Sequence, residues 1–240
     1  MTYRRLLLAL SLPLLSASPA AAQSSVVIWP VDPQIKATEQ ATALWLENRG
    51  NAPVTLQVRS FAWDQAGGED NYKDQDAVVS SPPIAQVGPG QRQLIRVIRR
   101  APDAAGEHAY RLVIDELPQP RQAPDADVSA QLSVQMRYSI PLFTYGAETA
   151  KTAPRLTSRV ELADGKRWLA VANGGTGHAR LTDLRTGSAA GKQSVTIKGG
   201  LIGYVLPGAT MRWELPDDAA PGAVFTVAVN GADQTLGQSS

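Results

Sequence analysis

The sequence predicts an all-β protein built from two tandem β-sandwich domains, and three observations lead to this prediction. Apolar and polar residues alternate with a period of two along most of the chain. Clusters of Gly, Pro, Asn and Asp interrupt the alternation at short intervals, as turns between strands do. No window longer than about ten residues shows the 3.6-residue period of an amphipathic helix. Short strands with frequent turns, in a chain of 240 residues, are typical of β-sandwiches.

Four segments in the first half are predicted strands, because β-branched and aromatic residues alternate there with polar ones. These segments are Thr42–Leu46, Val54–Arg59, Gln93–Ile98 and Tyr110–Asp115. Clusters of turn residues bound them, at Asn48–Asn51, Asp64–Gly68 and Gly88–Gly90. We therefore expect short strands joined by tight turns.

The second half of the chain repeats features of the first, which predicts a second, similar sandwich. Asn48, between two strand-like segments, is matched by Asn173. Further along, Pro89-Gly90 is matched by Pro207-Gly208, so the two pairs occur in the same order. Chance resemblance is the alternative, because any Asn-x-Gly hairpin produces a similar pattern.

Small and polar residues interrupt the alternation between Gly146 and Pro154, and we place the domain boundary there. The prediction is an N-terminal domain over residues 23–146 and a C-terminal β-sandwich domain over residues 147–240. Each would approach the size of an immunoglobulin-like domain, which is about 100 residues.

Residues 1–22 have the composition of a cleavable signal peptide. Arg4-Arg5 precedes the apolar run Leu6–Leu15, and Ala20–Ala22 supplies the small residues that signal peptidase accepts before Gln23. An apolar run of about ten residues is too short for a bilayer span, which needs about 20. The alternative is an uncleaved anchor. We expect an exported protein without stable membrane insertion, and the short basic segment suits bacterial export to the periplasm.

The composition excludes several classes of function. Without cysteine, the chain has no disulfide, no thiolate metal site and no cysteine nucleophile. The 23 Lys and Arg nearly balance the 22 Asp and Glu, so no basic excess predicts a nucleic-acid partner. The two histidines, His108 and His178, are isolated in the sequence; we expect no metal site and place both at exposed loops or strand ends. No nucleophile has a base beside it, so we predict no catalytic residue and no cofactor.

The longest alternating segment runs from Val128 to Ile140, whereas a strand usually has about five or six residues. A long edge strand with an apolar face must be covered, or else it exists to pair with another chain. A polar, proline-rich stretch over residues 119–127 precedes it, consistent with a segment that orders on binding. An ordinary sandwich strand that happens to be long is the alternative.

Seven segments in this order resemble the periplasmic chaperones of chaperone–usher pili. They are Ile28–Pro30, Leu44–Asn48, Gln57–Arg59 followed by Trp63, Ser81–Pro83, Gly88–Gln91, Tyr110–Pro118 and Met136–Phe143. In detail the chain is similar to the archaic, Csu-type branch, whose clients are pilus subunits of the spore-coat-protein-U type. The resemblance is strong from Val26 to Tyr145 and looser beyond.

The resemblance implies two immunoglobulin-like domains set at an angle, and a partner that is an incomplete pilus subunit lacking its last strand. In such chaperones the last strand of the first domain is donated to the subunit, and an outer-membrane usher then receives the complex. The matching strand here is residues 128–140. By this resemblance the principal side chains entering the subunit would be Leu132, Val134 and Met136, with flanking contacts from Val128, Ala130 and Tyr138.

One departure from the family pattern concerns the anchor for the subunit's terminal carboxylate. Well-known members use an Arg of the first strand and a Lys near the end of the donor strand. The matching positions here are Asp32 and Pro141. Our candidate replacement is Arg111. The alternation places its side chain on one face of the strand and those of Tyr110 and Leu112 on the other, so Arg111 points out of the sheet if the latter face the core. A guanidinium binds a carboxylate bidentately. A surface Arg paired with a neighbour on its own sheet is the alternative, and Arg137 is a weaker candidate.

The sequence is also compatible with two other classes of function. A secreted fibre component or adhesin built of tandem sandwiches would polymerise through an N-terminal extension. A periplasmic hydrolase or sugar-binding module would need a catalytic constellation or clustered exposed aromatics. The five tryptophans are spread over predicted strands, which favours core roles.

Overall fold

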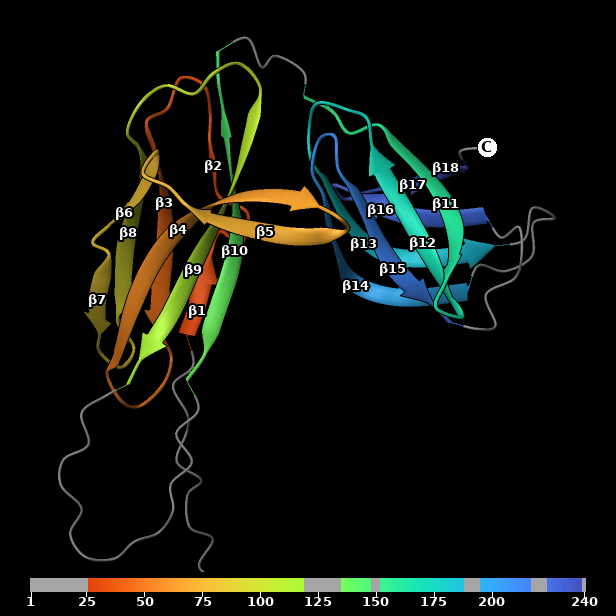
Figure 1. The fold of residues 1–240 in the computed structure, drawn as a ribbon. Coiled ribbons are helices and arrows are strands. Elements are labelled where there is room, and N and C mark those ends of the chain that lie inside the picture. The colour runs from red at the N-terminus through yellow and green to blue at the C-terminus, as the bar shows by residue number, and fades with distance from the viewer. Residues whose placement is uncertain (1–25, 119–134, 148–151, 188–194, 217–223, 239–240) are drawn as a thin grey trace, which may run out of the picture.

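A computed structural model describes residues 26–118, 135–147, 152–187, 195–216 and 224–238, and these residues form strands and loops (Figure 1). Eighteen strands are present in the described residues, and none of these residues is helical. No helix of the described part meets the length and hydropathy that a membrane span requires. The all-β prediction is therefore confirmed.

The first domain is a sandwich of two sheets. One sheet has the order β1 (Val26–Trp29), β3 (Ala41–Asn48), β8 (Arg92–Arg99), β6 (Val78–Ser81). The other has the order β2 (Gln34–Ile35), β10 (Arg137–Tyr145), β9 (Glu107–Leu117), β4 (Val54–Ala66), β5 (Glu69–Asp74), with β7 (Ile84–Val87) also pairing with β4. The four predicted strands correspond to β3, β4, β8 and β9, each longer than expected.

The core of the first domain lies between these sheets and follows the predicted alternation. Leu44 and Leu46 of β3 face Leu112 and Ile114 of β9, and all four side chains are fully buried. Tyr110 lies on the same side of β9. Burial of each aliphatic side chain contributes about 1.5 to 3 kcal/mol, so this alternation fixes which face of each strand turns inward.

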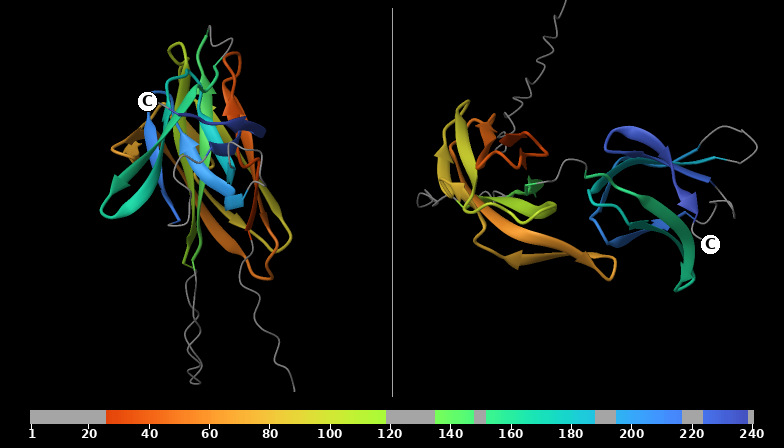
Figure 2. Two further views of the ribbon diagram at one scale, coloured as in Figure 1. Left: turned by 90° about the vertical axis from the view of Figure 1, so that its right-hand side faces the viewer. Right: turned by 90° about the horizontal axis from the view of Figure 1, so that it is seen from above.

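The second domain is also a sandwich of two sheets. One has the order β15 (Thr210–Leu215), β12 (Lys166–Asn173), β11 (Leu156–Ala163), β18 (Gly237–Gln238). The other has the order β14 (Val195–Val205), β13 (Ala179–Gly187), β16 (Val224–Val229), β17 (Ala232–Thr235). No sheet contains strands from both halves in the described residues. The two sandwiches lie side by side at an angle, as Figures 1 and 2 show.

The internal repeat marks the same structural element in both domains. The side chain of Asn48 is fully buried at the end of β3, where its amide donates to the carbonyls of Ala52 at 2.7 Å and Val87 at 3.0 Å. Its Oδ1 accepts from the N–H of Gly50 at 2.9 Å. The N–H of Gly90 donates to the Asn48 carbonyl at 2.7 Å.

Asn173 repeats this pattern at the end of β12. Its amide donates to Gly177 at 2.8 Å and Val205 at 3.0 Å, and its Oδ1 accepts from the N–H of Gly175 at 3.0 Å. Gly208 donates to the Asn173 carbonyl at 2.8 Å, as Gly90 does to Asn48. Both turn glycines have positive φ, +69° and +77°, which a side chain would oppose. The repeat is thus a shared turn structure.

The β4–β5 hairpin differs from the prediction. The expected turn at Asp64–Gly68 is reduced to Gly67 and Gly68, because β4 continues through Ala66. The hairpin extends out of the first sandwich towards the second domain, as Figure 1 and the right view of Figure 2 show. Strand β5 carries the sequence EDNYKD, and its residues are exposed except for Asn71, which is half-buried.

Candidate functional site

Strand β10 has a free edge over most of its length. It pairs with β9 from Arg137 to Tyr145. On its other side, β2 pairs only with Phe143 and Thr144. Residues 137–142 therefore have a single strand neighbour among the described residues. An edge of this kind offers backbone N–H and C=O groups to an added strand.

Charged residues hold the start of this strand on its outer, polar face. Arg137 of β10 forms an ion pair with Asp115 of β9. Arg59 of β4 reaches the same carboxylate at 2.7 Å from its Nη2. Partial burial raises the pKa of Asp115, but the hydrogen bonds from the two arginines outweigh it and lower that pKa overall. The three strands are thus linked by charge where the free edge begins.

The apolar face of β10 is buried in the core of its own domain towards the end of the strand and becomes exposed just before its start. Ile140 and Leu142 are buried in that core. Tyr138 packs against the same core, and its hydroxyl donates to Glu116 Oε1 at 3.3 Å. Met136, two residues earlier, is 45% exposed. The domain's own cover therefore ends between Tyr138 and Met136.

The structure describes only part of the predicted donor segment. Strand β10 covers its last residues and continues beyond Ile140 to Tyr145, further than the predicted end. Of the six predicted contact residues, Met136 and Tyr138 are described, and the other four lie outside the described residues: Val128, Ala130, Leu132 and Val134.

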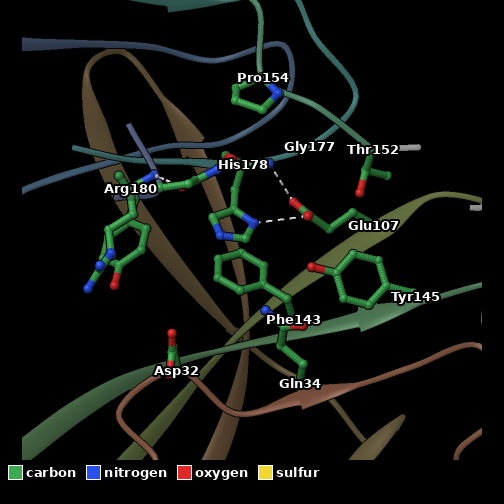
Figure 3. Close-up of a pocket in the computed structure, with 12 residues that line it drawn as sticks. Asp32, Gln34, Glu107, Phe143, Tyr145, Thr152, Pro154, Gly177, His178 and Arg180 are labelled. Atoms are coloured by element: carbon green, nitrogen blue, oxygen red, sulfur yellow. Dashed lines mark hydrogen bonds and ion pairs between the residues drawn. The ribbon is translucent and has the colours of Figure 1, made fainter. Parts of the chain in front are cut away.

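A cavity of about 280 Å³ lies between the two domains, beyond the end of the free edge (Figure 3). The first domain contributes Asp32 and Phe143, and the second contributes His178, Arg180 and Tyr204. Asp32 and Phe143 lie at the point where β2 begins to cover β10, because the N–H of Phe143 donates to the Pro33 carbonyl at 3.3 Å. The free edge therefore leads into this cavity.

One wall of the cavity joins the domains through His178. Its backbone N–H donates to Glu107 Oε1 at 2.7 Å, and its Nδ1 lies 2.9 Å from Glu107 Oε2. Its ring stacks on Phe143, with centroids 3.5 Å apart and planes 2° apart. Burial, with Glu107 nearby, strongly raises the pKa of the Tyr145 hydroxyl.

The prediction of an exposed position was wrong for His178, whose side chain is 14% exposed, although it does precede a strand. Its partner Glu107 belongs to the other domain, and no local sequence pattern connects the two residues. His108 accords better with the prediction, since it lies near the start of β9 and contacts the carbonyl of Ala104 at 3.1 Å.

Arg111 lies on the outer face of β9, opposite the core, as the alternation predicts. It is nevertheless only 8% exposed, because residues at the domain junction cover it. Its Cζ lies 3.8 Å from the ring centroid of Trp63 and 5.2 Å from that of Tyr204. Its Nη2 lies 3.9 Å from Asp70 Oδ2, and its buried Nε has no hydrogen-bond partner in the described residues. Its neighbour on β10 is Pro141.

The prediction of core roles for the tryptophans holds only in part. Trp63 is buried, but in the junction between the domains, where its ring contacts Tyr204 edge to face at 5.5 Å. Trp29 and Trp45 are half-buried and stack on one another, with centroids 6.2 Å apart. Leu44 and Leu46 face the core, so Trp45, between them, lies on the outer face of its sheet.

Comparison with known proteins agrees with this architecture. The family model described as pili and flagellar-assembly chaperone, PapD N-terminal domain, matches residues 25–148, more than half of the chain. No curated protein sequence matches the chain.

Solved structures extend the similarity to both domains. One is a chain of the CsuC–CsuE chaperone–tip adhesion subunit pre-assembly complex from archaic chaperone–usher Csu pili of Acinetobacter baumannii. It is 30% identical over 90% of this chain and 100% of that chain, with a TM-score of 0.72. The E. coli chaperone DraB is 16% identical, with coverages of 92% and 99% and a TM-score of 0.63. A chain of the Salmonella enterica SafA pilin–SafB chaperone complex is 19% identical, with coverages of 90% and 99% and a TM-score of 0.61.

The last two similarities show the fold alone, whereas the first agrees with the family model in pointing to one group of proteins. The chain therefore belongs to the pili and flagellar-assembly chaperone family, in its archaic Csu-type branch.

Proposed function

We propose that this chain is a periplasmic chaperone that binds incomplete pilus subunits by strand addition and delivers them to an outer-membrane usher. The observation that carries the proposal is the free edge of β10 over residues 137–142. An added strand would satisfy these backbone groups and extend the sheet. Because Pro141 has no N–H, the edge offers one donor fewer near its end. Family membership disfavours the alternative of a secreted fibre component or adhesin, and the family is a class of chaperones and not of enzymes.

The side chains proposed to enter the subunit are those of the donor segment 128–140. Leu132, Val134 and Met136 would be the principal contacts, with Val128 and Ala130 beside them. Tyr138 packs against the core of its own domain, so only the exposed part of its side chain would contact the subunit. The exposure of Met136 supports this assignment, because the apolar face loses its own cover there. Each aliphatic side chain buried in a subunit would contribute about 1.5 to 3 kcal/mol, before the cost of ordering the segment.

Arg111 is the proposed anchor for the subunit's terminal carboxylate. Its support is its place beside Pro141 at the end of the free edge, its charge and its unpartnered Nε. Its contact with Asp70, in β5 of the same sheet, supports the alternative of an Arg paired with a neighbour on its own sheet, although burial beside Trp63 means that this Arg does not lie on the surface. Client binding at Arg111 would require the Asp70 carboxylate to be replaced by that of the subunit.

The anchor is tested with Arg111→Ala and Arg111→Lys, each co-expressed with a subunit ending in either its natural carboxylate or an added glycine tail. An anchor predicts that Arg111→Ala loses complex with the natural subunit, and that the tailed subunit binds the unmodified chaperone poorly. Equal complex yields from Arg111→Ala and the unmodified chain would reject the anchor and leave the strand proposal standing.

We also propose the division of the chain into a signal peptide over residues 1–22, a client-binding domain over 23–146 and a second sandwich over 147–240. Chaperones of this family are periplasmic, which supports export and cleavage before Gln23. N-terminal sequencing of the protein from a periplasmic extract tests the cleavage site.

The whole proposal is tested by co-expression with a pilus subunit of the spore-coat-protein-U type, followed by size-exclusion chromatography. A stable 1:1 complex is the expected result. Homopolymers of the chain, with no subunit bound, would contradict the proposal and favour the fibre component.

A further inference from the structure

The β4–β5 hairpin is a bridge between the two domains. It belongs to the first domain by its pairing, yet its far end reaches the second domain beside β14 (Figures 1 and 2). Strand β14 pairs only with β13 in the described residues, so its other side is the edge of that sheet. The hairpin thus approaches an edge where backbone groups need partners.

Gln65 makes the contact through its side-chain amide. Its Nε2 donates to the carbonyl of Tyr204 at 3.0 Å, and its Oε1 accepts from the N–H of Leu206 at 2.8 Å. Bonds to residues 204 and 206 are the pair that one residue of a neighbouring parallel strand would form. One glutamine side chain therefore takes the place of a strand residue at the edge of the second domain.

Asp70 holds this glutamine in the required orientation. Asp70 Oδ1 accepts from Gln65 Nε2 at 2.8 Å and from Trp63 Nε1 at 2.9 Å. The amide nitrogen of Gln65 thus has two acceptors, so its oxygen is directed to Leu206. The other oxygen of Asp70 accepts from the Tyr72 hydroxyl at 3.2 Å and faces Arg111. Hydrogen bonds within the hairpin therefore hold the Gln65 side chain in place at this contact.

A second set of hydrogen bonds between the domains lies at Glu107, which binds His178 as described above, and the rings of Trp63 and Phe143 pack against the second domain between these two places. One contact between two bodies leaves rotation about that contact, whereas two separated contacts restrict it. The Gln65 contact and the Glu107 contact lie on different strands of the first domain, β4 and β9.

We propose that Gln65, held by Asp70, is a positioning residue that fixes the orientation of the second domain relative to the free edge of β10. The effect on client binding rests on the proposed function. The subunit would lie along β10 and end at the cavity between the domains, so a variable domain orientation would change the space at that end. The domain orientation itself can be measured without a client.

The test uses the absence of cysteine, which allows two spin labels to be placed uniquely. Gln86→Cys in β7 and Gln234→Cys in β17 are exposed strand positions, one in each domain. The distance distribution between the labels is measured by pulsed electron paramagnetic resonance. It is recorded for the labelled chain, for Gln65→Ala, and for Gln65→Glu, which keeps the size but replaces the donor.

Gln75→Ala is a matched control. The Gln75 amide also binds backbone groups, donating to the carbonyls of Ser60 and Val78 and accepting from the N–H of Val78, but all of these lie in the first domain. Its loss should lower the melting temperature without changing the label distances.

We expect Gln65→Ala and Gln65→Glu to broaden the distance distribution at least twofold and to weaken binding of a co-purified subunit several-fold. A distribution as narrow as in the unmodified chain would overturn the inference. Broadening without any loss of subunit binding would overturn the positioning role. If Gln65→Ala does not fold, Gln65→Glu decides. Failure of the unmodified chain to bind a subunit would reject the proposed function, while the distances would still decide the domain orientation.

Discussion

Asn173→Ala should destabilise the second domain strongly, because one buried side chain there organises a complete turn. Asn173 is 1% exposed, and its side chain makes four hydrogen bonds, to Gly177, Val205, Gly175 and the N–H of Arg155. Each net hydrogen bond is worth about 1 kcal/mol, so losing all four should cost about 4 kcal/mol. That is a large part of the roughly 5 to 15 kcal/mol that stabilises a domain.

The repeat provides an internal comparison for this magnitude. Asn48 makes three side-chain hydrogen bonds in the first domain, so Asn48→Ala should cost about 3 kcal/mol. Asn51 lies in the same turn but is exposed, which makes Asn51→Ala a control expected to change stability by less than about 0.5 kcal/mol. Urea unfolding followed by tryptophan fluorescence measures all three. If Asn173→Ala costs no more than Asn51→Ala, the assignment of these bonds as the support of the turn is wrong.

Three further predictions concern the strand and the domain junction. Met136→Asp should reduce the yield of subunit complex more than tenfold in co-purification, since a charge would enter the apolar groove of the pilus subunit. Ser139→Asp, on the polar face of β10, should have little effect in the same experiment. The pKa of Asp115 is lower in the folded protein than in the unfolded chain, so its ion pairs stabilise the fold above about pH 3.9, and this stabilisation is lost as the pH falls through the folded pKa. Asp115→Asn should therefore reduce the dependence of the unfolding free energy on pH in the acid range. An unchanged dependence would contradict this. Glu107→Gln should lower the free energy of unfolding by about 1 to 2 kcal/mol and make the two domains unfold less cooperatively in calorimetry, because a buried acceptor of the His178 hydrogen bonds is weakened. Unchanged cooperativity would argue against this link.

The sequence predicts the sandwiches well because both depend on local patterns. Period-two alternation identified β3, β4, β8 and β9, and the Asn48 and Asn173 turns were detectable because the same residues must satisfy the same backbone groups. The alternation alone also predicted that the Arg111 side chain lies on the outer face of β9.

The domain junction could not be predicted in this way. Gln65 and Tyr204 are 139 residues apart, and Glu107 and His178 are 71 apart, so their contacts depend on how two finished domains meet. The burial of Arg111 has the same origin, since Trp63 and Tyr204 cover it from two different domains. Gln65 even lies in a segment whose composition predicted a turn, because two glycines follow it closely.

The charged composition of β5 has a consequence for where a foreign chain can dock. The second sheet of the first domain ends in β5 on the side away from β10, and β5 presents three acidic residues and a lysine along a six-residue strand. An apolar segment of an incomplete pilus subunit that paired with β5 would remove water from those charges, and this desolvation cost disfavours pairing there. The charges of β5 thereby disfavour nonspecific strand pairing at one edge of the sheet, and the free edge of β10 remains the proposed place for the subunit.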